Sequence, residues 1–429
     1  MPSADSLFLG IDLGTSQCRI AVVDATGTQI AFAGVPIPPP ERAQGCIAQD
    51  PEIWWRAATV ALDAALASID AKRVRAIAVD GTSGTLLLTD AAGRPLTPAL
   101  MYNDQSSTAQ AARIAAVAPS DSAARGASSA LAKLLQLAAA APGAQARHAL
   151  HQADWIAGRL RGRFGTADEN NALKLGYDPV TRRWPAWMAN LDIDATVLPD
   201  VVPAGTDLGV IDSAIADHLD MARNVRIVAG TTDSVAASLA AGIAGIGDAV
   251  TSLGSTLVLK VASQHPIADA AHGIYTHRIG DWWLAGGASN AGGAALATLF
   301  SPPEIESLSA RIDPDTASPL DLYPLPGMGE RFPVADPAMA PRLAPRPDDD
   351  ASYLHGLLES LARIERDGYR LLERLGAPYP RAVRTAGGGA RNAAWTRIRA
   401  RVLGIDVIPA VSAEAAHGAA LLALRAVPQ

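Results

Sequence analysis

The chain has 429 residues, 49% hydrophobic and 18% charged, which indicates two or three globular domains and excludes a disordered chain. Its formal net charge of −7 argues against a broad nucleic-acid-binding surface, because such a surface needs clustered Lys and Arg. No lysine is followed by Ser or Thr, so the chain has no Walker A loop.

The N-terminus and the cysteines favour a cytoplasmic protein. The first residues lack a basic segment followed by a long apolar run, so no signal peptide is predicted, and no uninterrupted apolar stretch reaches membrane-spanning length. Cys18 and Cys46 are too few for a disulfide framework or a zinc site. We expect a reducing compartment and neither nucleic acid nor membrane as a partner.

Taken in chain order, strand patterns alternate with helix patterns. Residues 7–27 read as strand, turn and strand, and residues 47–69 as a helix capped by Asp50. Residues 74–96 read as strand, glycine-rich break and strand. Further along, residues 224–243 read as strand, loop and helix, and residues 248–263 as strand, turn and strand. Strands followed by helices predict an α/β fold.

Two of the predicted hairpins resemble each other. Residues 11–16 read IDLGTS and residues 251–256 read TSLGST, so each places a glycine and two hydroxyl residues between apolar strands. This short match predicts two related halves, one beginning near residue 7 and one near residue 248.

The turn of the first hairpin is a candidate phosphate site. Backbone N–H groups around Gly14, with the hydroxyls of Thr15 and Ser16, can donate to phosphate oxygens. Asp12 beside a phosphate makes sense only if Mg²⁺ lies between them. A plain hairpin with polar turn residues explains the pattern equally well. The second turn, Gly254 to Thr256, lacks a carboxylate and is the weaker signal alone.

Residues 385–395, TAGGGARNAAW, place three glycines between a strand pattern and a helix pattern. Glycines there let a flat ligand or a phosphate approach the backbone, although the spacing is not that of a dinucleotide-binding loop. The alternative is a flexible turn with Asn392 as a local helix cap.

Asp233 stands at the start of a helix pattern. Asp is a favoured N-cap, but Thr231, Thr232 and Ser234 could serve as well, so the helix does not need an acid here. A carboxylate at a helix start is kept ionised and can accept a hydroxyl proton during phosphoryl transfer. Local chemistry leaves cap and base both open.

Two polar clusters suit a ligand with many hydroxyl groups. Residues 80–85 read DGTSGT and residues 102–104 read YND, each after a strand pattern. Turn chemistry explains both clusters equally well.

Together these motifs resemble the FGGY carbohydrate kinases, within the actin-like ATPase superfamily. The likeness runs from about residue 7 to about residue 425 and rests on six segments in the family's order: GIDLGTS, AQDPEIWW, AGTTDSVAASLAAG, TSLGST, GGASNAGGA and AGGGARNAAW. The resemblance implies an α/β fold of two actin-like (ribonuclease H-like) domains with a ligand cleft between them. We expect an N-terminal sugar-binding domain over 1–240, with a helix in 412–429 packing back on it, and a nucleotide-binding domain over 241–411.

The resemblance also implies residue roles. Asp233 would be the base and Asp12 would hold Mg²⁺. The nucleotide, ATP, would be bound by residues of both turns, of the glycine-rich segment and of the adenosine motif: Gly14, Thr15, Ser16, Gly254, Ser255, Thr256, Gly292, Gly387, Gly388 and Asn392.

The choice of sugar is read from the two polar clusters. Many xylulose kinases have a Met-His pair, and glycerol kinases an Arg-Glu pair, where this chain has DGTSGT. The form with Ser83 resembles the D-ribulose kinase branch. YNDQS departs from the common WxDxR pattern, which puts the contacts around Asp104 in doubt. The sugar contacts implied are Asp12, Ser83, Gly84, Asn103, Asp104 and Asp233.

The resemblance therefore implies an ATP-dependent kinase, for which we expect D-ribulose as substrate, D-ribulose 5-phosphate as product and a monomer or homodimer as the assembly. D-xylulose, L-ribulose or another polyol is the alternative substrate. A sugar-binding regulator with a decayed site, or a filament or chaperone ATPase, is the alternative from a different class.

Overall fold

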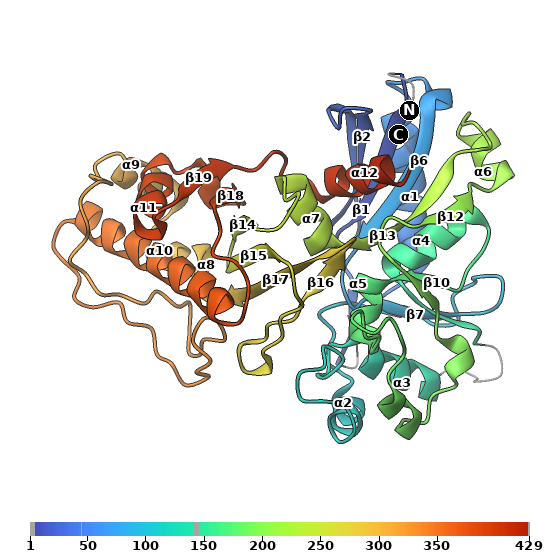
Figure 1. Ribbon diagram of the computed structural model, residues 1–429, viewed down its shortest axis with the longest axis horizontal. Coiled ribbons are helices and arrows are strands. Elements are labelled where there is room, and N and C mark those ends of the chain that lie inside the picture. The colour runs from blue at the N-terminus through green and yellow to red at the C-terminus, as the bar shows by residue number, and fades with distance from the viewer. Residues whose placement is uncertain (1–4, 44, 141–145, 428–429) are drawn as a thin grey trace. The chain divides into compact units, whose positions relative to one another are not determined.

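The computed structural model describes residues 5–43, 45–140 and 146–427. The chain divides into two compact units. The first unit comprises Met1–Ala240, His277–Gly280 and Glu414–Gln429, and the second comprises Ala241–Thr276 and Asp281–Ala413. Among the described residues, the first unit contains a six-stranded, a five-stranded and a two-stranded sheet, and the second unit is built around a single sheet (Figure 1).

The first unit holds the N-terminal strands and most of the shorter helices. Its strands are β1 (Leu7–Leu13), β2 (Gln17–Asp24), β3 (Gln29–Pro36), β4 (Glu41–Ala43), β5 (Cys46–Gln49), β6 (Val74–Gly81), β7 (Leu86–Thr89), β8 (Ala99–Leu100), β9 (His148–His151), β10 (Thr166–Asp168), β11 (Asp200–Val202), β12 (Asp207–Val210), β13 (Arg226–Thr232) and β16 (His277–Ile279). Its helices are α1 (Pro51–Leu66), α2 (Thr108–Ala115), α3 (Ala130–Ala140), α4 (Gln152–Arg161), α5 (Glu169–Ala172), α6 (Ser213–His218), α7 (Asp233–Ala241) and α12 (Ala415–Ala426).

The second unit is simpler and contains the longest helix. Its strands are β14 (Asp248–Leu253), β15 (Leu257–Ser263), β17 (Trp282–Ser289), β18 (Ala382–Ala386) and β19 (Asp406–Pro409). Its helices are α8 (Gly293–Ala297), α9 (Pro302–Ser309), α10 (Asp350–Arg374) and α11 (Ala393–Leu403).

Both units repeat one strand order, so the two related halves predicted from the hairpins are confirmed. In the first sheet the order is β3-β2-β1-β6-β13, followed by β12, and in the second it is β17-β15-β14-β18-β19. In each sheet the first three strands pair antiparallel and the last two of these five add in parallel. The α/β fold class predicted from the sequence is therefore confirmed.

One predicted element begins later than expected. The helix expected over 47–69 runs only from Pro51, where Asp50 accepts a hydrogen bond from the Glu52 N–H at 3.0 Å. Residues 46–49 instead form β5, because they pair with β8, a strand about fifty residues away along the chain.

The C-terminal helix α12 packs on β1 and β6 of the first unit (Figure 1). The close approach requires small residues: a Cβ added to Gly10 would lie 1.9 Å from the Ala416 carbonyl oxygen. The helix expected within 412–429 therefore returns to the N-terminal sheet, and residues 428–429 lie outside the described part of the chain.

A buried ion pair joins the two long helices of the second unit to its sheet. The Arg399 guanidinium donates to both oxygens of Glu365, at 2.6 and 2.7 Å, and to Thr385 Oγ1 at 2.7 Å. Glu365 Oε1 also accepts from Thr251 Oγ1 at 2.6 Å. Thr251 and Thr385 lie opposite each other on β14 and β18, so this network fixes the two strands side by side.

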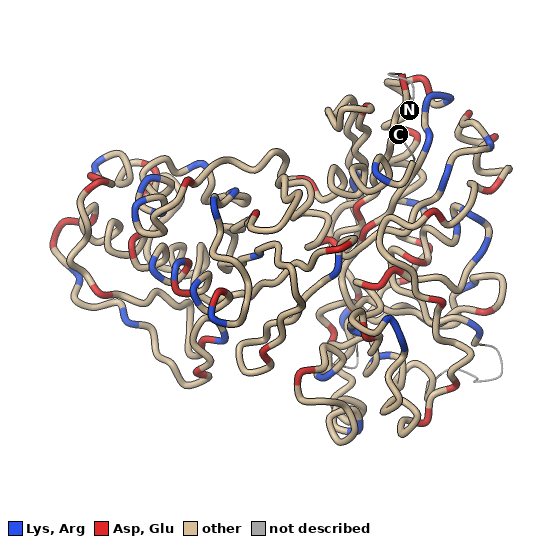
Figure 2. The backbone as a smooth tube through the Cα atoms, viewed as in Figure 1, with Lys and Arg blue, Asp and Glu red and all other residues tan. Residues whose placement is uncertain are grey.

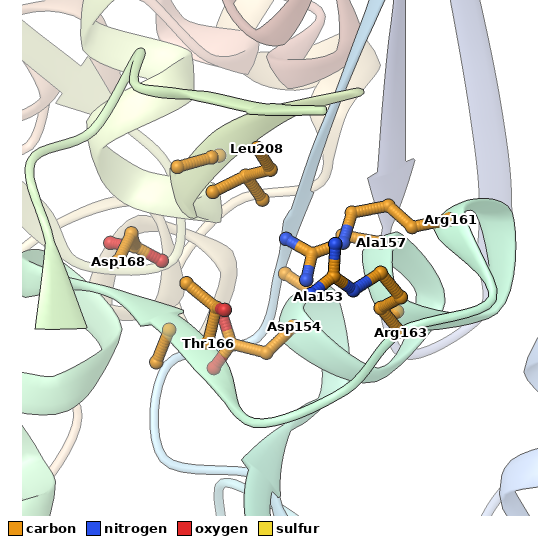
Figure 3. A pocket seen from close by; sticks show the side chains of 12 residues that line it. Ala153, Asp154, Ala157, Arg161, Arg163, Thr166, Asp168 and Leu208 are labelled. Carbon is orange, nitrogen blue, oxygen red and sulfur yellow. The ribbon is translucent and has the colours of Figure 1, made fainter. Parts of the chain in front are cut away.

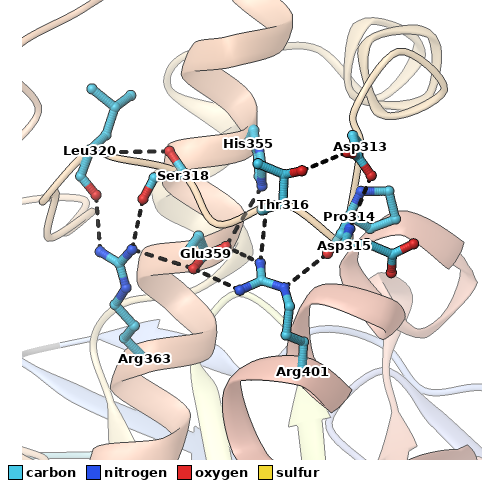
Figure 4. A network of polar contacts seen from close by, with 10 residues as sticks. All are labelled: Asp313, Pro314, Asp315, Thr316, Ser318, Leu320, His355, Glu359, Arg363 and Arg401. Carbon is cyan, nitrogen blue, oxygen red and sulfur yellow. Dashed lines mark hydrogen bonds and ion pairs between the residues drawn. The ribbon is translucent and has the colours of Figure 1, made fainter.

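A second polar network joins the same two helices to the segment before α10 (Figure 4). Glu359 accepts hydrogen bonds from Arg363 and Arg401, and Arg401 also donates to the Pro314 carbonyl at 3.0 Å. This arrangement anchors the irregular segment before α10 to α11.

Along the described backbone, acidic and basic positions are interspersed in both units (Figure 2). Among the helices of the described residues, none is long and apolar enough to cross a membrane.

Candidate active site

Three carboxylates gather at one edge of the first sheet. Asp12 near the end of β1 is the register partner of Asp80 on β6, and Thr231 of β13 pairs with Asp80 on its other side. Asp233 follows β13 directly and begins α7. Because β1, β6 and β13 run parallel, their carboxyl ends meet at the same edge, which is where α/β proteins place ligand sites.

Asp80 is the most deeply buried of the three. Its side chain is fully buried, and within the described residues neither of its carboxylate oxygens accepts a hydrogen bond. Burial raises the pKa of Asp80 well above its usual range, and the charges of Asp12 and Asp233 raise it further. The sequence analysis marked the DGTSGT cluster but did not select Asp80. The signal was present, since a lone acid ends the apolar strand VRAIAVD.

Arg19 on β2 moderates the charge of Asp12. The two residues are register partners, and Arg19 Nη1 lies 3.2 Å from Asp12 Oδ2. Arg19 Nε lies 3.5 Å from a carboxylate oxygen of Glu414, just before α12. Burial raises the pKa of Asp12, and the side-chain contact with Asp80 and then the Arg19 guanidinium oppose that rise. The sequence analysis missed Arg19, although the hairpin register places it opposite Asp12.

Asp233 occupies the first turn of α7 and is partly exposed. Its Oδ1 accepts the Ser234 N–H at 2.7 Å. The residue is thus the first helical residue rather than one that precedes the helix, and the helix dipole stabilises its negative charge. The structure also places Asp233 beside Asp12 and Asp80 at the ends of the strands, where a ligand site is expected. The local sequence could not show this position.

The first turn, Gly14 to Ser16, connects β1 and β2 beside this cluster. The Gly14 N–H donates to the Gln17 carbonyl at 3.0 Å, and Ser16 is exposed. The turn thus begins two residues after Asp12, at the end of β1, as the sequence spacing requires.

The residues predicted to contact the sugar divide into two kinds. Ser83 Oγ and Asn103 Oδ1 are buried without a hydrogen-bond partner in the described part of the chain. Asp104 instead uses both oxygens within the protein, accepting from the Ile47 N–H at 2.6 Å and from Ser106 Oγ at 2.6 Å. Ser83 and Asn103 are therefore suited to a ligand, whereas the contacts of Asp104 are those of a residue that holds its turn.

In the second unit, the remaining predicted residues gather around one cavity of about 930 Å³. Its wall includes Gly254 and Ser255 from the β14–β15 turn, Gly293 at the start of α8, and Gly388 and Asn392 after β18. The turns meet because β14 and β18 run parallel, with Ser252 opposite Ala386. A cavity of this size accommodates a nucleoside.

Glycine is required where these segments touch. Gly387 has φ +85°, and a Cβ there would lie 2.6 Å from the Leu253 carbonyl oxygen. A Cβ on Gly292 would lie 2.7 Å from the Ser255 carbonyl oxygen. Gly387, Gly292 and Thr256 are thus next to the cavity wall rather than part of it, and backbone fills the space that side chains would take.

Asn392 has both of the properties considered from the sequence. Its Oδ1 accepts the Trp395 N–H at 2.9 Å and caps α11, and its Nδ2 donates to Ser309 Oγ at 2.8 Å. It also lines the cavity, together with Glu306 and Ser309 of α9. The sequence analysis missed these two α9 residues, because no glycine or strand signal precedes them.

A much smaller cavity lies in the first unit behind α4 (Figure 3). Arg161, Arg163, Asp154, Thr166 and Asp168 line a space of about 10 Å³. Such a space holds about one water molecule. It cannot hold a sugar or a nucleotide, so it is not part of the candidate site.

The repeated strand order, the carboxylates at the strand ends and the glycine-lined cavity are those of an actin-like ATPase fold. Residues 7–240 match the N-terminal domain of the FGGY family of carbohydrate kinases, and residues 249–427 match its C-terminal domain. The chain belongs to this family and is a phosphotransferase.

Individual relatives agree with this assignment. The chain is 25% identical to the xylulose kinase of Escherichia coli K12 over 420 residues, which cover 93% of this chain and 85% of that protein. It is 24% identical to the xylulose kinase of Bacillus subtilis 168, covering 97% and 87% of the two chains.

The crystal structure of xylulose kinase from Rhodospirillum rubrum matches with a TM-score of 0.85 at 24% identity, over 97% of this chain and 89% of that one. Gluconate kinase from Lactobacillus acidophilus matches equally well in fold, with a TM-score of 0.85 at 17% identity over 98% and 89% of the chains. The fold alone therefore does not select the sugar.

Proposed function

We propose that the protein transfers the γ-phosphate of ATP to a hydroxyl of a ketopentose, with Asp233 as the base. The observation that carries this proposal is the cluster of Asp12, Asp80 and Asp233 at the carboxyl ends of three parallel strands. A sugar hydroxyl attacks more readily as its proton moves to a carboxylate, and the dipole of α7 stabilises a negative charge on Asp233.

D-ribulose is the substrate proposed first, and D-ribulose 5-phosphate its product. The choice rests on the resemblance of DGTSGT, with Ser83, to the D-ribulose kinase branch; many xylulose kinases have a Met-His pair at this place. The Ser83 hydroxyl is buried without a partner in the described residues, which suits a sugar ligand. D-xylulose is the second candidate, because the curated relatives reported above are xylulose kinases.

Asp12 is the proposed ligand for Mg²⁺, and its carboxylate oxygens suit this hard cation. The described residues hold no group of three or more His, Cys, Asp or Glu side chains arranged to bind a metal. Mg²⁺ often takes only one or two protein carboxylates and completes its shell with phosphate oxygens and water, so the residues present fit it. When bound, the ion neutralises charge on the phosphate oxygens.

The proposed roles of the two units follow from their contents. The first unit, with 412–429 added to 1–240, would bind the sugar, and residues 241–411 would bind ATP. The cavity in the second unit supports the latter assignment, because glycine backbone and the polar groups of Ser309 and Asn392 line it. For the assembled protein we propose a monomer or homodimer in the cytoplasm.

The test is an ADP-release assay over a panel of pentuloses, hexuloses and polyols with Mg²⁺ and ATP. We expect one ketopentose to dominate, with D-ribulose ahead of D-xylulose. ATP turnover that is independent of any sugar would instead indicate a filament or chaperone ATPase, and ATP binding without turnover would indicate a regulator.

The residue-level test is Asp233→Asn, which keeps the shape and removes the base. We expect loss of at least about a hundredfold in kcat, the usual contribution of a general base, with ATP binding retained. The matched control is Asp212→Asn at the N-cap of α6, where Asn caps as well as Asp. Full activity of Asp233→Asn would exclude Asp233 as the base.

A further inference from the structure

Hydrogen bonds to other segments of the chain hold the turn from Thr82 to Thr85, which lies between β6 and β7. Gln152 Oε1 accepts from the Thr82 N–H at 3.1 Å and from Thr82 Oγ1 at 2.8 Å. The hydroxyls of Thr82 and Thr85 lie 2.6 Å apart, and the Thr85 hydroxyl accepts the Tyr102 N–H at 2.9 Å. The last contact ties this turn to the turn that carries Asn103.

Two lysines reach the backbone carbonyls of the same turn. Lys133 on α3 donates from Nζ to the Gly84 carbonyl at 2.7 Å and to the Ser128 carbonyl at 2.9 Å. Lys174 donates to the Ser83 carbonyl at 3.4 Å. Lys133 is fully buried, which is rare for a lysine and requires that its polar head be satisfied.

The backbone conformation at Gly84 favours glycine, because its φ of +90° is one that L side chains rarely adopt. An added Cβ would be in ordinary van der Waals contact, 3.4 Å from Lys174 Cδ and 3.4 Å from the Ser128 carbonyl oxygen. The two lysines fix the peptide groups on both sides of this residue.

What the turn leaves unpaired is the Ser83 hydroxyl. The hydroxyls of Thr82 and Thr85 have partners, whereas Ser83 Oγ is buried and makes no hydrogen bond to the described residues. A buried hydroxyl without a partner costs free energy, so this group points to a ligand.

We propose that Lys133, assisted by Lys174, is a positioning residue that fixes the Ser83 hydroxyl for hydrogen bonding to a substrate hydroxyl. Lys133 does not touch the sugar; it acts through the Gly84 carbonyl. The proposal rests on the proposed function, because it takes the group facing Ser83 to be a sugar. Preorganisation of this kind strengthens binding, since the turn is ordered before the ligand arrives.

The chemistry of Lys133 suits this positioning role better than a role that only fills space in the core. An apolar side chain of similar length, such as Met, would fill the same space without burying an amine. Burial lowers the pKa of Lys133 to about 7, with the charge of Lys174 adding to the effect and Asp104 opposing it. Even as a neutral amine, Lys133 retains two N–H groups for the two carbonyls that it contacts.

The experiment compares Lys133→Met with Lys72→Met, a matched control at a lysine whose side chain is 67% exposed. Hydrogen exchange is measured at the amides of Thr82 to Thr85 in the full chain. We expect exchange to be at least about tenfold faster in Lys133→Met and unchanged in Lys72→Met, since a lost buried hydrogen bond corresponds to roughly that factor. Equal exchange in both variants would overturn the proposal.

Kinetics separate positioning from general destabilisation. In Lys133→Met we expect kcat/KM for D-ribulose or D-xylulose, whichever the wild type uses, to fall about tenfold, while the KM for ATP stays unchanged. Ser83→Ala should lose a similar factor, and the double variant should lose little more than Ser83→Ala alone. Losses that multiply in the double variant would show that Lys133 does not act through Ser83.

Two further outcomes, a variant that does not fold and a wild type without sugar kinase activity, are covered by separate measurements. If Lys133→Met does not fold, Lys174→Met, whose side chain is partly exposed, is expected to show the same pattern at smaller size, and normal exchange there overturns the proposal. If the wild type phosphorylates no sugar, the proposed function fails, while hydrogen exchange still decides whether the lysines order the turn.

Discussion

Asp12 and Asp80 face each other as register partners on adjacent parallel strands, and both side chains are buried. Two carboxylates this close cannot both ionise without mutual repulsion. The protein keeps the pair although an apolar or amide residue at position 80 would avoid the conflict. Such a retained conflict is typical of a functional site, where stability is given up for chemistry.

The first prediction concerns this pair. Asp80→Asn removes one acid and supplies an amide N–H that can donate to Asp12. We expect the free energy of unfolding at neutral pH to rise by about 1 kcal/mol, while activity falls because the charge balance of the cluster changes. Denaturant unfolding and kcat measure the two effects. Asp70→Asn, at an exposed cap, should change neither, and a loss of stability in Asp80→Asn would contradict the repulsion argument.

Several features of this site could be predicted from sequence because they are local. The hairpin turn at Gly14 and its counterpart at Gly254 lie at breaks between two strand patterns, and the glycine run after β18 lies between a strand pattern and a helix pattern. Their pairing into two similar halves follows from the shared turn motif, and the strand order confirms it.

Other features depend on contacts between distant parts of the chain. Lys133 lies 49 residues from the carbonyl that it contacts, and its helix pattern gives no sign of a polar partner. The lone acid Asp80 is visible in the sequence, but its pairing with Asp12 is known only once β1 and β13 are seen to flank β6. Residues 47–49 read as part of a helix because β8, the strand with which this segment pairs, is remote in the sequence. In each of these examples, contacts between distant segments rather than local propensity determine the structure.

The second prediction is a pH dependence of stability caused by Lys133. Its pKa is lowered to about 7 in the folded protein from an ordinary value of 10.5, so between these values the unfolded chain binds the proton and the folded chain does not. Stability from this group therefore rises with pH across that window, by at most about 1.4 kcal/mol per pH unit. Denaturant unfolding of the wild type and of Lys133→Met, compared from pH 7 to pH 9 or so, measures the difference.

The expected difference in stability between wild type and Lys133→Met has a definite direction. Wild type should gain stability relative to Lys133→Met as the pH rises, while Lys72→Met should run parallel to the wild type. If the curves of wild type and Lys133→Met run parallel, the buried amine is not titrating in this window.

The third prediction tests the glycine contact beside the nucleotide cavity. Gly387→Ala places a methyl group 2.6 Å from the Leu253 carbonyl at a residue with φ +85°. The loop must shift, so we expect the KM for ATP to rise at least about tenfold through misplacement of the cavity wall. Gly376→Ala is the matched control, because it has φ +109° but nothing within 4 Å of the added carbon. An equal effect of the two substitutions would assign the loss to backbone strain alone.

The last prediction concerns the buried pair of Arg399 and Glu365 in the second unit. Arg399→Met leaves the Glu365 carboxylate buried with its two strongest donors removed, which should cost about 3–5 kcal/mol. Arg399→Met with Glu365→Gln removes the unpaired charge, so the double variant should recover part of that loss. Because Thr251 and Thr385 connect this pair to β14 and β18, the single variant should also weaken ATP binding at the turns that follow those strands. Denaturant unfolding and ATP titration of both variants decide whether the pair serves stability alone or also holds the nucleotide turns in register.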